Sequence, residues 1–541
     1  MQSNTMQNQK ILRRIFKVFF SSSYNHLEQL RKLANECKSK LNKSTFEPRR
    51  VLFIHMHGSD YLLTFEGILV NRLRLEGVEP SYLTCSALPL CNNRRYFTVP
   101  DYPAICMNCN QHNRDHAEII GCELKFLGEY ERNGIRTLAQ HATTELSLEQ
   151  CLEFVWDGVP LGTLCAVSVS RYLCRDARNI DRPSDLWYFR RFLESGVILV
   201  DSLKTALMQL KPNVIIQNSG RFFWYAIADF IARERNIKVV SYEGDGGFGR
   251  TWMFREKVPA SSLDISELWL AGCAPQLSDI QNQNLDHLLQ ERRSGSMVKG
   301  FVSKSSFSFE TNLPRSIESL KGSVIALFSN LTFDSQVSER HTIFKGVIDW
   351  LSFTIQNIEN STATYVIRVH PAEAQEHEGE YSRERVIDEL RDRGIRIPRN
   401  VVIISPAERV NSYALAERAQ LSVVYTSTIG LELIIGGNQV VVCGLAHYID
   451  KGFGIIPNTK EEYLSKILDI KEKSIPSSEE IELARSYGYT FWFKGIKQIK
   501  AFSTNSRFHV GKLLMDRPSR IVRGADAALD ELIDLVLNKS I

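Results

Sequence analysis

The sequence of 541 residues contains no run of eighteen or more apolar residues, so we predict no transmembrane helix. The apolar patch at 15–20 is short and no small-residue cleavage site follows it, so no signal peptide is predicted either. A net charge of +4 is nearly neutral for this length and excludes an overall nucleic-acid-binding footprint. We therefore expect a cytoplasmic protein that does not bind nucleic acid.

Internal repeats are also missing. The composition, with 43% hydrophobic and 24% charged residues, is that of an ordinary soluble protein. A chain of 541 residues is too long for one hydrophobic core. Two large domains with extensions are therefore expected.

Positive charge is concentrated at the N-terminus, where residues 1–50 hold eleven Lys and Arg against three Glu. Large apolar residues are interleaved with the bases between 10 and 20. This pattern predicts a basic amphipathic helix that rests on the anionic inner face of a membrane, so that the protein associates peripherally. The alternatives are a helix packed on its own domain and a partly disordered arm.

Apolar, β-branched runs alternate with helical periodicity in both halves of the chain. In the first half, strands are expected at 50–55, 80–84, 166–170, 214–217 and 237–241, and helices at 62–75 and 221–236. In the second half, strands are expected at 324–328, 365–369, 401–404, 421–425 and 439–443, and helices at 341–359 and 429–435. This alternation predicts a parallel sheet in each half.

The predicted fold class is therefore α/β, with two Rossmann-like domains facing across a cleft and helical extensions at both ends. The tail is expected to cross back and brace the first domain. The expected units are a basic helical extension (1–48), a first Rossmann-like domain (49–275), a polar linker (276–320), a second Rossmann-like domain (321–480) and an aromatic-rich helical tail (481–541).

Two strand ends in the second half carry polar groups suited to an anion. His370-Pro371 ends the first of these strands, which also carries Arg368, and Ser427-Thr428 opens the helix after the second. A helix N-terminus offers unpaired N–H groups and a positive dipole end to a phosphate. Open α/β sheets bind ligands in the crevice at such strand ends, so a phosphate ester of a nucleotide is the expected ligand.

Two Rossmann-like domains with a phosphate-type site in the second describe the B-type glycosyltransferase architecture. The chain resembles the bacterial capsule-polysaccharide biosynthesis glycosyltransferases, a group that includes β-Kdo transferases. The resemblance extends over 323–459. Its matching pieces are Phe328-Ser-Asn330, Arg368-Val-His-Pro371, Ser427-Thr-Ile-Gly-Leu-Glu432, Gly436-Gly437, Gly444-Leu-Ala-His-Tyr448 and Gly452.

This resemblance implies a donor site in the second domain. His370 and Arg368 would neutralise the donor phosphate, and Ser427 and Thr428 would cap it from the helix N-terminus. Glu432 would bind ribose or sugar hydroxyls. Ser329, Asn330 and Tyr448 belong to the same implied donor site.

The alternatives for these residues are structural. His370 would be a strand-end histidine bonded to a loop, Ser427 and Thr428 ordinary helix caps, and Glu432 a surface residue.

Weaker resemblance in the first half implies an acceptor side. Asn218-Ser-Gly-Arg221, followed by Tyr242-Glu-Gly244, is similar to the acceptor-side segment of such proteins. Asn218 and Arg221 are its expected binding residues, together with Gly58 in the first strand-end turn.

Transfer without an Asp-x-Asp metal motif needs stabilisation of the leaving phosphate and a base for the acceptor hydroxyl. We find no such motif at a strand end. The strand at 237–241 runs into a glycine-rich loop at 242–249, whose backbone can approach a ligand closely. Glu243 and Asp245 are therefore the first choices for the base, and His57 is the third. The alternative for Glu243 is that it only organises the loop.

Four of the eleven cysteines are closely spaced. Cys85, Cys91, Cys106 and Cys109 follow a Cys-x5-Cys-x14-Cys-x2-Cys pattern, with His112 and His116 as possible substitutes. The closing pair is a knuckle suited to zinc or to an iron–sulfur cluster, and a structural role is favoured. The alternative is unconnected reduced thiols, as is usual in a cytosolic protein. No cofactor is expected to be required for catalysis.

The leading hypothesis is an enzyme, a glycosyltransferase that moves a sugar from a nucleotide-activated donor to a bacterial surface polysaccharide or a lipid-linked glycan. The alternatives are a nucleotide-sugar 2-epimerase, a CDP-polyol phosphotransferase and a non-catalytic glycan-binding scaffold. The segments at 218–221 and 444–448 favour transfer over epimerisation.

Overall fold

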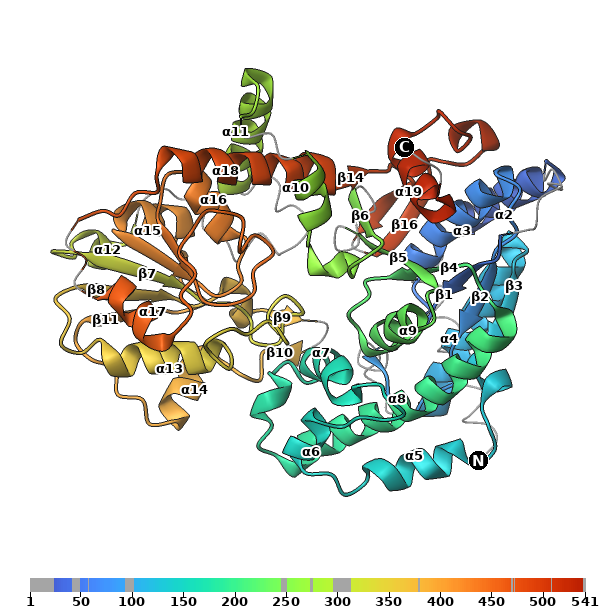
Figure 1. Ribbon diagram of the computed structural model, residues 1–541, viewed down its shortest axis with the longest axis horizontal. Helices are drawn as coiled ribbons and strands as arrows, with labels where there is room; N and C mark the ends of the chain where they lie inside the picture. Colours follow the sequence, from blue (N-terminus) through green and yellow to red (C-terminus); the bar gives the residue numbers. More distant parts are fainter. Residues whose placement is uncertain are drawn as a thin grey trace, which may run out of the picture.

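The chain contains two large sheets, one in each half, and most of their strands are parallel (Figure 1). The computed structural model describes residues 24–40, 49–56, 58–92, 102–244, 251–272, 276–294, 313–377, 380–468, 470, 472–506 and 508–538. The predicted N-terminal membrane-binding segment and two predicted catalytic residues, His57 and Asp245, lie outside these residues. None of the described helices is both long enough and apolar enough to cross a membrane.

The first sheet has the order β14-β6-β5-β4-β1-β2-β3. Five neighbouring strands are parallel, and β6 and β14 add to one edge in antiparallel fashion. Every residue of β1 and β4 is buried, as expected for central strands covered on both faces. The strands are β1 (Val51–Ile54), β2 (Ser81–Thr84), β3 (Glu123–Phe126), β4 (Val214–Asn218), β5 (Lys238–Gly244), β6 (Thr251–Arg255) and β14 (Lys497–Gln498).

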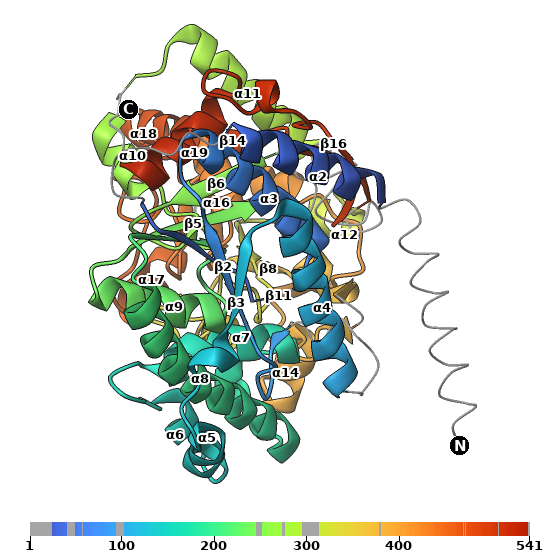
Figure 2. The ribbon, with the colours of Figure 1, turned by 90° about the vertical axis from the view of Figure 1, so that its right-hand side faces the viewer.

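Helices cover both faces of this sheet because alternate residues of its strands point in opposite directions. Val51 and Phe53 pack with α2 (Tyr24–Ser39), α3 (Asp60–Leu75) and α19 (Ala527–Leu537), and α4 (Tyr102–Ile120) lies beside α2 and α3 (Figure 2). Leu52 and Ile54 pack with α7, α8 and α9. The helices on that side are α5 (Ile135–Thr143), α6 (Leu148–Leu152), α7 (Leu161–Leu173), α8 (Pro183–Leu210) and α9 (Phe223–Glu234).

The second sheet is wholly parallel, with the order β11-β8-β7-β12-β13. Alternate residues of β7 again face two different cores, one with α15, α16 and α18 and the other with α13, α14 and α17. The elements are β7 (Val324–Phe328), α13 (Val347–Asn357), β8 (Thr364–Arg368), α14 (Val386–Asp392), β11 (Val401–Ile404), α15 (Ser412–Arg418), β12 (Leu421–Val424), α16 (Ile429–Ile435), β13 (Val440–Val442), α17 (Lys460–Ile467) and α18 (Ser478–Tyr489).

Numbered from the start of its own domain, each sheet has the parallel strand order 3-2-1-4-5 of a doubly wound fold. The predicted fold class of two Rossmann-like α/β domains is therefore confirmed.

Three helices lie between the two sheets along the chain: α10 (Ser266–Gly272), α11 (Asp279–Arg293) and α12 (Arg315–Glu318). The segment predicted as a polar linker therefore contains a helix of fifteen residues, α11. The short strands β9 (Glu376–His377) and β10 (Glu380–Tyr381) form a separate hairpin.

The strand predicted at 166–170 is wrong, because these residues lie within helix α7. All five are buried, so the alternation of apolar residues with serine does not mark an exposed strand face. Both serines can be buried because their hydroxyls accept hydrogen bonds from backbone N–H groups. Ser168 accepts from the Phe223 N–H at 2.8 Å, and Ser170 accepts from the Ala177 N–H at 2.9 Å.

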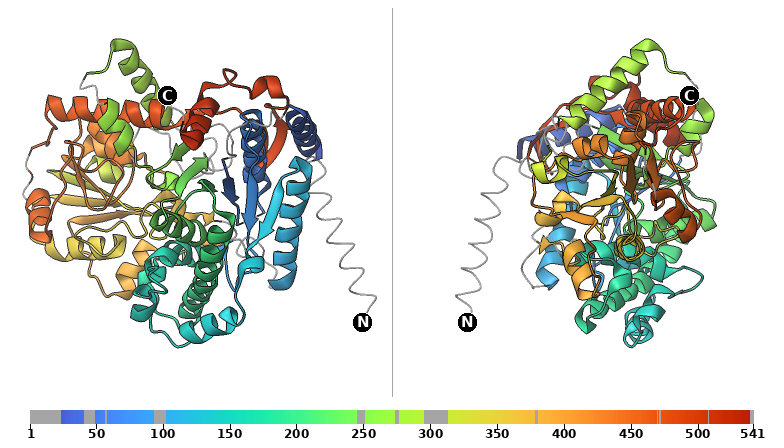
Figure 3. Two further views of the ribbon diagram at one scale, coloured as in Figure 1. Left: turned by 45° about the vertical axis from the view of Figure 1, so that its right-hand side comes forward. Right: turned by 90° about the vertical axis from the view of Figure 1, so that its left-hand side faces the viewer.

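The C-terminal tail crosses from the second domain to the first (Figure 3). Helix α18 packs on α16, and β14 then pairs with β6 of the first sheet. The tail also contains a hairpin, β15 (Phe502–Ser506) with β16 (His509–Leu513), where only helix was predicted. Arg72 of α3 pairs with Asp530 of α19 at 2.9 Å, so the tail is fixed to the first domain.

Candidate functional site

In each sheet the connections reverse direction beside the first strand, and ligands bind at the carboxyl ends of the strands at such a switch point. The switch points lie between β1 and β4 in the first domain and between β7 and β12 in the second. The predicted residues follow these strands. Gly58 comes after β1, Asn218 ends β4, Ser329 and Asn330 follow β7, and Ser427 and Thr428 follow β12.

Three strand ends of the second domain are joined by hydrogen bonds. The Ser329 hydroxyl accepts from the His370 backbone N–H at 2.9 Å, which connects β7 to β8. The Asn330 side-chain oxygen accepts from the Thr426 N–H at 3.3 Å, which connects β7 to β12. The structure therefore brings together the predicted donor residues after β7, β8 and β12.

His370 adopts the geometry of a helix cap. Its Nδ1 accepts from the Ala372 N–H at 3.2 Å and so caps the short 3-10 helix Pro371–Ala374. A ring nitrogen that accepts carries no proton, so a neutral ring holds its proton on Nε2. The cap therefore orients the ring through Nδ1.

Arg368 is buried and bonds to backbone. Its guanidinium donates to the carbonyls of Ser405 at 2.8 Å and Glu408 at 3.0 Å. Burial lowers the pKa of Arg368 to about 10, so it stays charged at neutral pH. In this conformation Arg368 shapes the loop after β11, and two of its donors are already used there.

The Ser427-Thr428 turn is held from behind by Tyr448. The Tyr448 hydroxyl donates to the Ser427 carbonyl at 2.7 Å, and Tyr448 itself is buried. A Cβ at Gly430 would lie 2.2 Å from that hydroxyl, so glycine is required for this approach. Tyr448 thus positions the turn from within the core.

Glu432 is not the surface residue that the structural alternative assumed. It is 1% exposed, and Arg292 of α11 donates to its Oε1 at 2.9 Å. Its other oxygen accepts from the Tyr413 hydroxyl. Because both carboxylate oxygens are bonded by protein side chains, the candidate donor site does not depend on Glu432.

The turn after β4 in the first domain is tightly constrained. Ser219 and Gly220 have φ of 57° and 87°, and a Cβ at Gly220 would come within 2.8 Å of Pro259. The Asn218 side chain donates to the Tyr242 carbonyl at 3.1 Å, which joins β4 to β5. Arg221 donates to the Ser338 carbonyl of the second domain at 2.7 Å. The loops after β4 and β7 are therefore in direct contact.

Glu243 lies at the end of β5 beside this turn and is half-buried. Burial raises the pKa of Glu243 to about 7, although hydrogen bonds from the Ser219 side chain and the Gly244 backbone act in the opposite direction. A carboxyl group with a pKa near neutrality is suited to general acid–base chemistry. Of the three predicted bases, only Glu243 belongs to the described residues.

Sequence reasoning missed Glu66, a fully buried residue of α3. Its carboxylate bonds the His55 ring at 2.8 Å and accepts from the Tyr242 hydroxyl at 2.6 Å. Glu66 thus connects the end of β1 to the residue before Glu243. The only sequence signal was a single acidic residue inside an apolar helical run.

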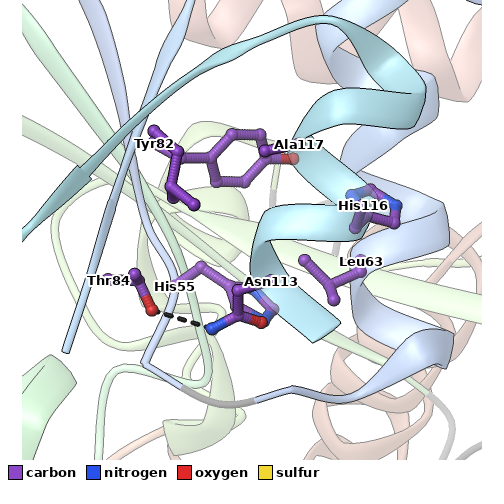
Figure 4. Close-up of a pocket in the computed structure, with 8 residues that line it drawn as sticks. His55, Leu63, Tyr82, Thr84, Asn113, His116 and Ala117 are labelled. Carbon is purple, nitrogen blue, oxygen red and sulfur yellow. Dashed lines mark hydrogen bonds between the residues drawn. The ribbon is translucent and has the colours of Figure 1, made fainter. Parts of the chain in front are cut away.

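A small cavity lies between β1, β2, α3 and α4 (Figure 4). The space open to the centre of a water-sized sphere is about 10 Å³, close to what one water occupies. Figure 4 shows Asn113 reaching Thr84, to which it donates at 2.9 Å. The cavity is lined by His55, Leu63, Tyr82, Thr84, Asn113, His116, Ala117 and Leu124.

His116 is the least satisfied polar group of this cavity. It is 1% exposed, and neither ring nitrogen has a hydrogen-bond partner in the described part of the chain. Burial, followed by the neighbouring His112, lowers the pKa of His116 to about 3, so the ring is neutral at neutral pH. A cavity of this volume is too small for a sugar or a nucleotide.

We expect His116→Leu to leave the free energy of unfolding within about 1 kcal/mol of the wild type, or to raise it. A buried polar group without partners costs about 1–3 kcal/mol, and leucine avoids that cost. Urea unfolding followed by circular dichroism measures the difference. Leu63→Ala is the matched control from the same cavity and should cost about 2–5 kcal/mol. A loss above about 2 kcal/mol for His116→Leu would contradict this and would mean that a polar partner holds the ring.

The four predicted metal-ligating cysteines share one neighbourhood. Burial first, and then Cys85, Cys91 and Cys106, raise the pKa of the Cys109 thiol. Even so, no three His, Cys, Asp or Glu side chains among the residues described here form a group that could hold a metal ion. The thiols in this conformation do not fit a tetrahedral thiolate site. A structural zinc ion or iron–sulfur cluster remains a prediction, and no chemistry below depends on it.

Comparisons with known proteins do not assign a family. No protein-family model matches the chain, and no curated protein matches its sequence. Among solved structures, the KpsC beta Kdo 2,4 transferase of Thermosulfurimonas dismutans aligns with a TM-score of 0.34 and 13% identity, over 60% of this chain and 87% of that one.

Two further structures align over more of the chain. The UDP-GlcNAc 2-epimerase of Neisseria meningitidis has a TM-score of 0.21 and 10% identity, over 91% of this chain and 100% of that one. The glycosyltransferase SnogD of Streptomyces nogalater has a TM-score of 0.22 and 12% identity, over 82% and 96%. All three TM-scores are under 0.5, so the fold rests on the strand orders described above and the function on the site.

Proposed function

We propose that this chain is a glycosyltransferase that moves a sugar from a nucleotide-activated donor to a surface polysaccharide or lipid-linked glycan acceptor. One observation carries the proposal. The loops that follow β4 and β7 at the two switch points touch through Arg221 and Ser338, and the strand ends beside them carry groups suited to the two halves of the reaction.

The donor phosphate would lie at the joined strand ends of the second domain. His370 supplies a donor from Nε2, and the Ser427-Thr428 turn supplies hydroxyl and backbone donors. Arg368 adds a positive charge nearby without giving up its bonds to the loop. Such preorganised donors stabilise the charge that develops on a leaving phosphate.

The acceptor would approach from the first domain, where Glu243 serves as the base. Its carboxylate takes the proton of the acceptor hydroxyl as the acceptor oxygen bonds to the anomeric carbon. The bond from that carbon to the phosphate oxygen breaks, and the nucleotide leaves with the electron pair. Asn218 and Glu66 hold the ends of β4, β5 and β1 that form this side.

We expect a nucleotide to raise the melting temperature of the wild type, because it binds the folded state only. A screen of CMP, CDP, UDP and GDP identifies the nucleotide, and His370→Ala should abolish the rise. His370→Asn separates two roles, since asparagine keeps an acceptor for the cap but lacks the Nε2 donor. His287→Ala, an exposed histidine on α11, is the matched control and should keep the rise. An unchanged rise in His370→Ala would refute the assignment.

Product analysis with a nucleotide-sugar alone separates transfer from the alternative enzyme class. An epimerase converts the nucleotide-sugar without an acceptor, whereas a transferase at most hydrolyses it slowly. Conversion to an epimer by the wild type would overturn the proposed reaction but would leave the nucleotide site intact.

A further inference from the structure

Two buried acidic residues lie next to each other at the contact between the domains. Asp176 precedes the 3-10 helix Ala177–Asn179 of the first domain, and Glu384 precedes α14 of the second. The Asp176 backbone N–H donates to Glu384 Oε2 at 2.7 Å, and the Asn179 amide donates to Oε1 at 2.6 Å. Asp176 is 3% exposed and Glu384 is fully buried.

Within the described residues, no ion pair includes Asp176 or Glu384, because the neighbouring arginines pair with other acids. The pairs are Arg175 with Asp181 and Asp185, Arg383 with Asp185, and Arg178 with Glu339. The donors that reach Glu384 are a backbone N–H and an amide, both uncharged.

Two adjacent carboxylates in a dry interface cannot both ionise cheaply, because each loses hydration and repels the other. Burial first, and Glu384 second, hold the pKa of Asp176 well above its ordinary range, while the Arg178 N–H and guanidinium act in the opposite direction. Glu339 of the facing loop raises it further. Further titratable groups of this neighbourhood are His341, Asp349, Tyr425, Glu373, Arg385, Asp388 and Glu389.

We propose that Asp176, buried beside Glu384, keeps its proton while the two domains are in contact, and that loss of this proton loosens the contact. The direction of the pH dependence follows from the coupling between proton binding and domain closure. An acid whose pKa is higher in the closed form than in the open form binds more protons when closed. The closed form is therefore most favoured at low pH and loses stability as pH rises through the raised pKa.

This pair lies within the same interface that joins the two switch points. Arg178, two residues from Asp176, pairs with Glu339 at 2.6 Å, and the Arg221 contact with Ser338 is next to Glu339 in sequence. Loosening at Asp176 would therefore separate the loops that join the two halves of the candidate site. The inference concerns domain closure and holds whichever reaction the site performs.

Hydrogen exchange of the full-length chain tests the pair where it lies. The peptides that cover 172–180 and 381–387 contain the Asp176 N–H and the Arg383 N–H, which donates to the Cys174 carbonyl at 3.0 Å across the interface. The protection factor of each peptide is the intrinsic exchange rate divided by the measured rate, which removes the direct effect of pH on exchange. In the wild type this factor should fall by about tenfold between pH 6 and pH 8, since each unit of raised pKa corresponds to about a tenfold change.

Asp176→Asn removes the titrating carboxyl group, Glu384→Gln removes its acidic neighbour, and both substitutions keep the shape of the side chain. The protection should change by less than about threefold over the same range in Asp176→Asn, and by less than in the wild type in Glu384→Gln. Asp229→Asn, which breaks the Arg233 pair within α9, is the control and should behave as the wild type does. Two variants are used so that a folding defect in one leaves the other as the test. Wild-type protection that is independent of pH, or an equal response in both pair variants, would overturn the proposal.

Discussion

Replacement of Glu243 by Gln is expected to lower the rate of sugar transfer by roughly a hundred- to ten-thousand-fold, the usual contribution of a general base. Glutamine keeps the shape of the side chain but cannot take the acceptor proton. The base must be ionised, and burial raises the pKa of Glu243 to about 7. The wild-type rate should therefore be highest above pH 7 and fall as pH drops through this value.

Ser219→Ala is the matched variant, because the Ser219 hydrogen bond lowers the pKa of Glu243. Without it the acidic limb of the rate profile should move to higher pH, while the rate at high pH stays close to that of the wild type. Rates measured from pH 5.5 to 9 with the nucleotide-sugar identified by the melting screen provide the comparison. A Glu243→Gln enzyme with the wild-type rate and profile would remove Glu243 from the mechanism.

Gly430→Ala is expected to destabilise the second domain by about 2–3 kcal/mol, as overpacking of a filled core does. The added Cβ would lie 2.2 Å from the Tyr448 hydroxyl, which is held by the Ser427 carbonyl. Relief of this clash would displace the Ser427-Thr428 turn, so nucleotide binding should weaken as well. Urea unfolding and the nucleotide-dependent melting shift measure the two effects.

Tyr448→Phe supplies the control, since it removes the clashing oxygen. Alone it should cost about 1 kcal/mol for the lost hydrogen bond to Ser427. In the double variant the cost of Gly430→Ala should fall by at least about 1 kcal/mol, because the two substitutions act on one contact. Simple addition of the two costs would show that the clash does not explain the need for glycine.

Much of the secondary structure could be predicted because the central strands are continuous apolar runs. Buried parallel strands such as β1, β4, β7 and β12 face a core on both sides, so their sequences differ clearly from the turns beside them. Helix α16 was placed correctly as well, since Thr428 and Gly436 flank it. Helix α7 was missed because its buried serines imitate the alternation of a strand.

Several side-chain roles could not be read from the chain. Glu432 stands in a motif that implies ligand binding, yet Arg292 reaches it from a helix 140 residues earlier. Glu66 shows no motif, yet it connects β1 to β5. Such partners depend on which faces of distant helices meet, and local periodicity carries no information on that.

Hydrophobic periodicity and turn residues act locally, so the α/β class, the mainly parallel sheets and the polar strand ends could be inferred from the chain alone. Which of these residues meet depends instead on how the elements pack in three dimensions. The Asn330 bond to Thr426, the Arg221 bond to Ser338 and the Asp176 bond to Glu384 each join segments far apart in the chain. Each forms only because packing of the two cores buries those groups together, where an unpaired donor or acceptor would be costly.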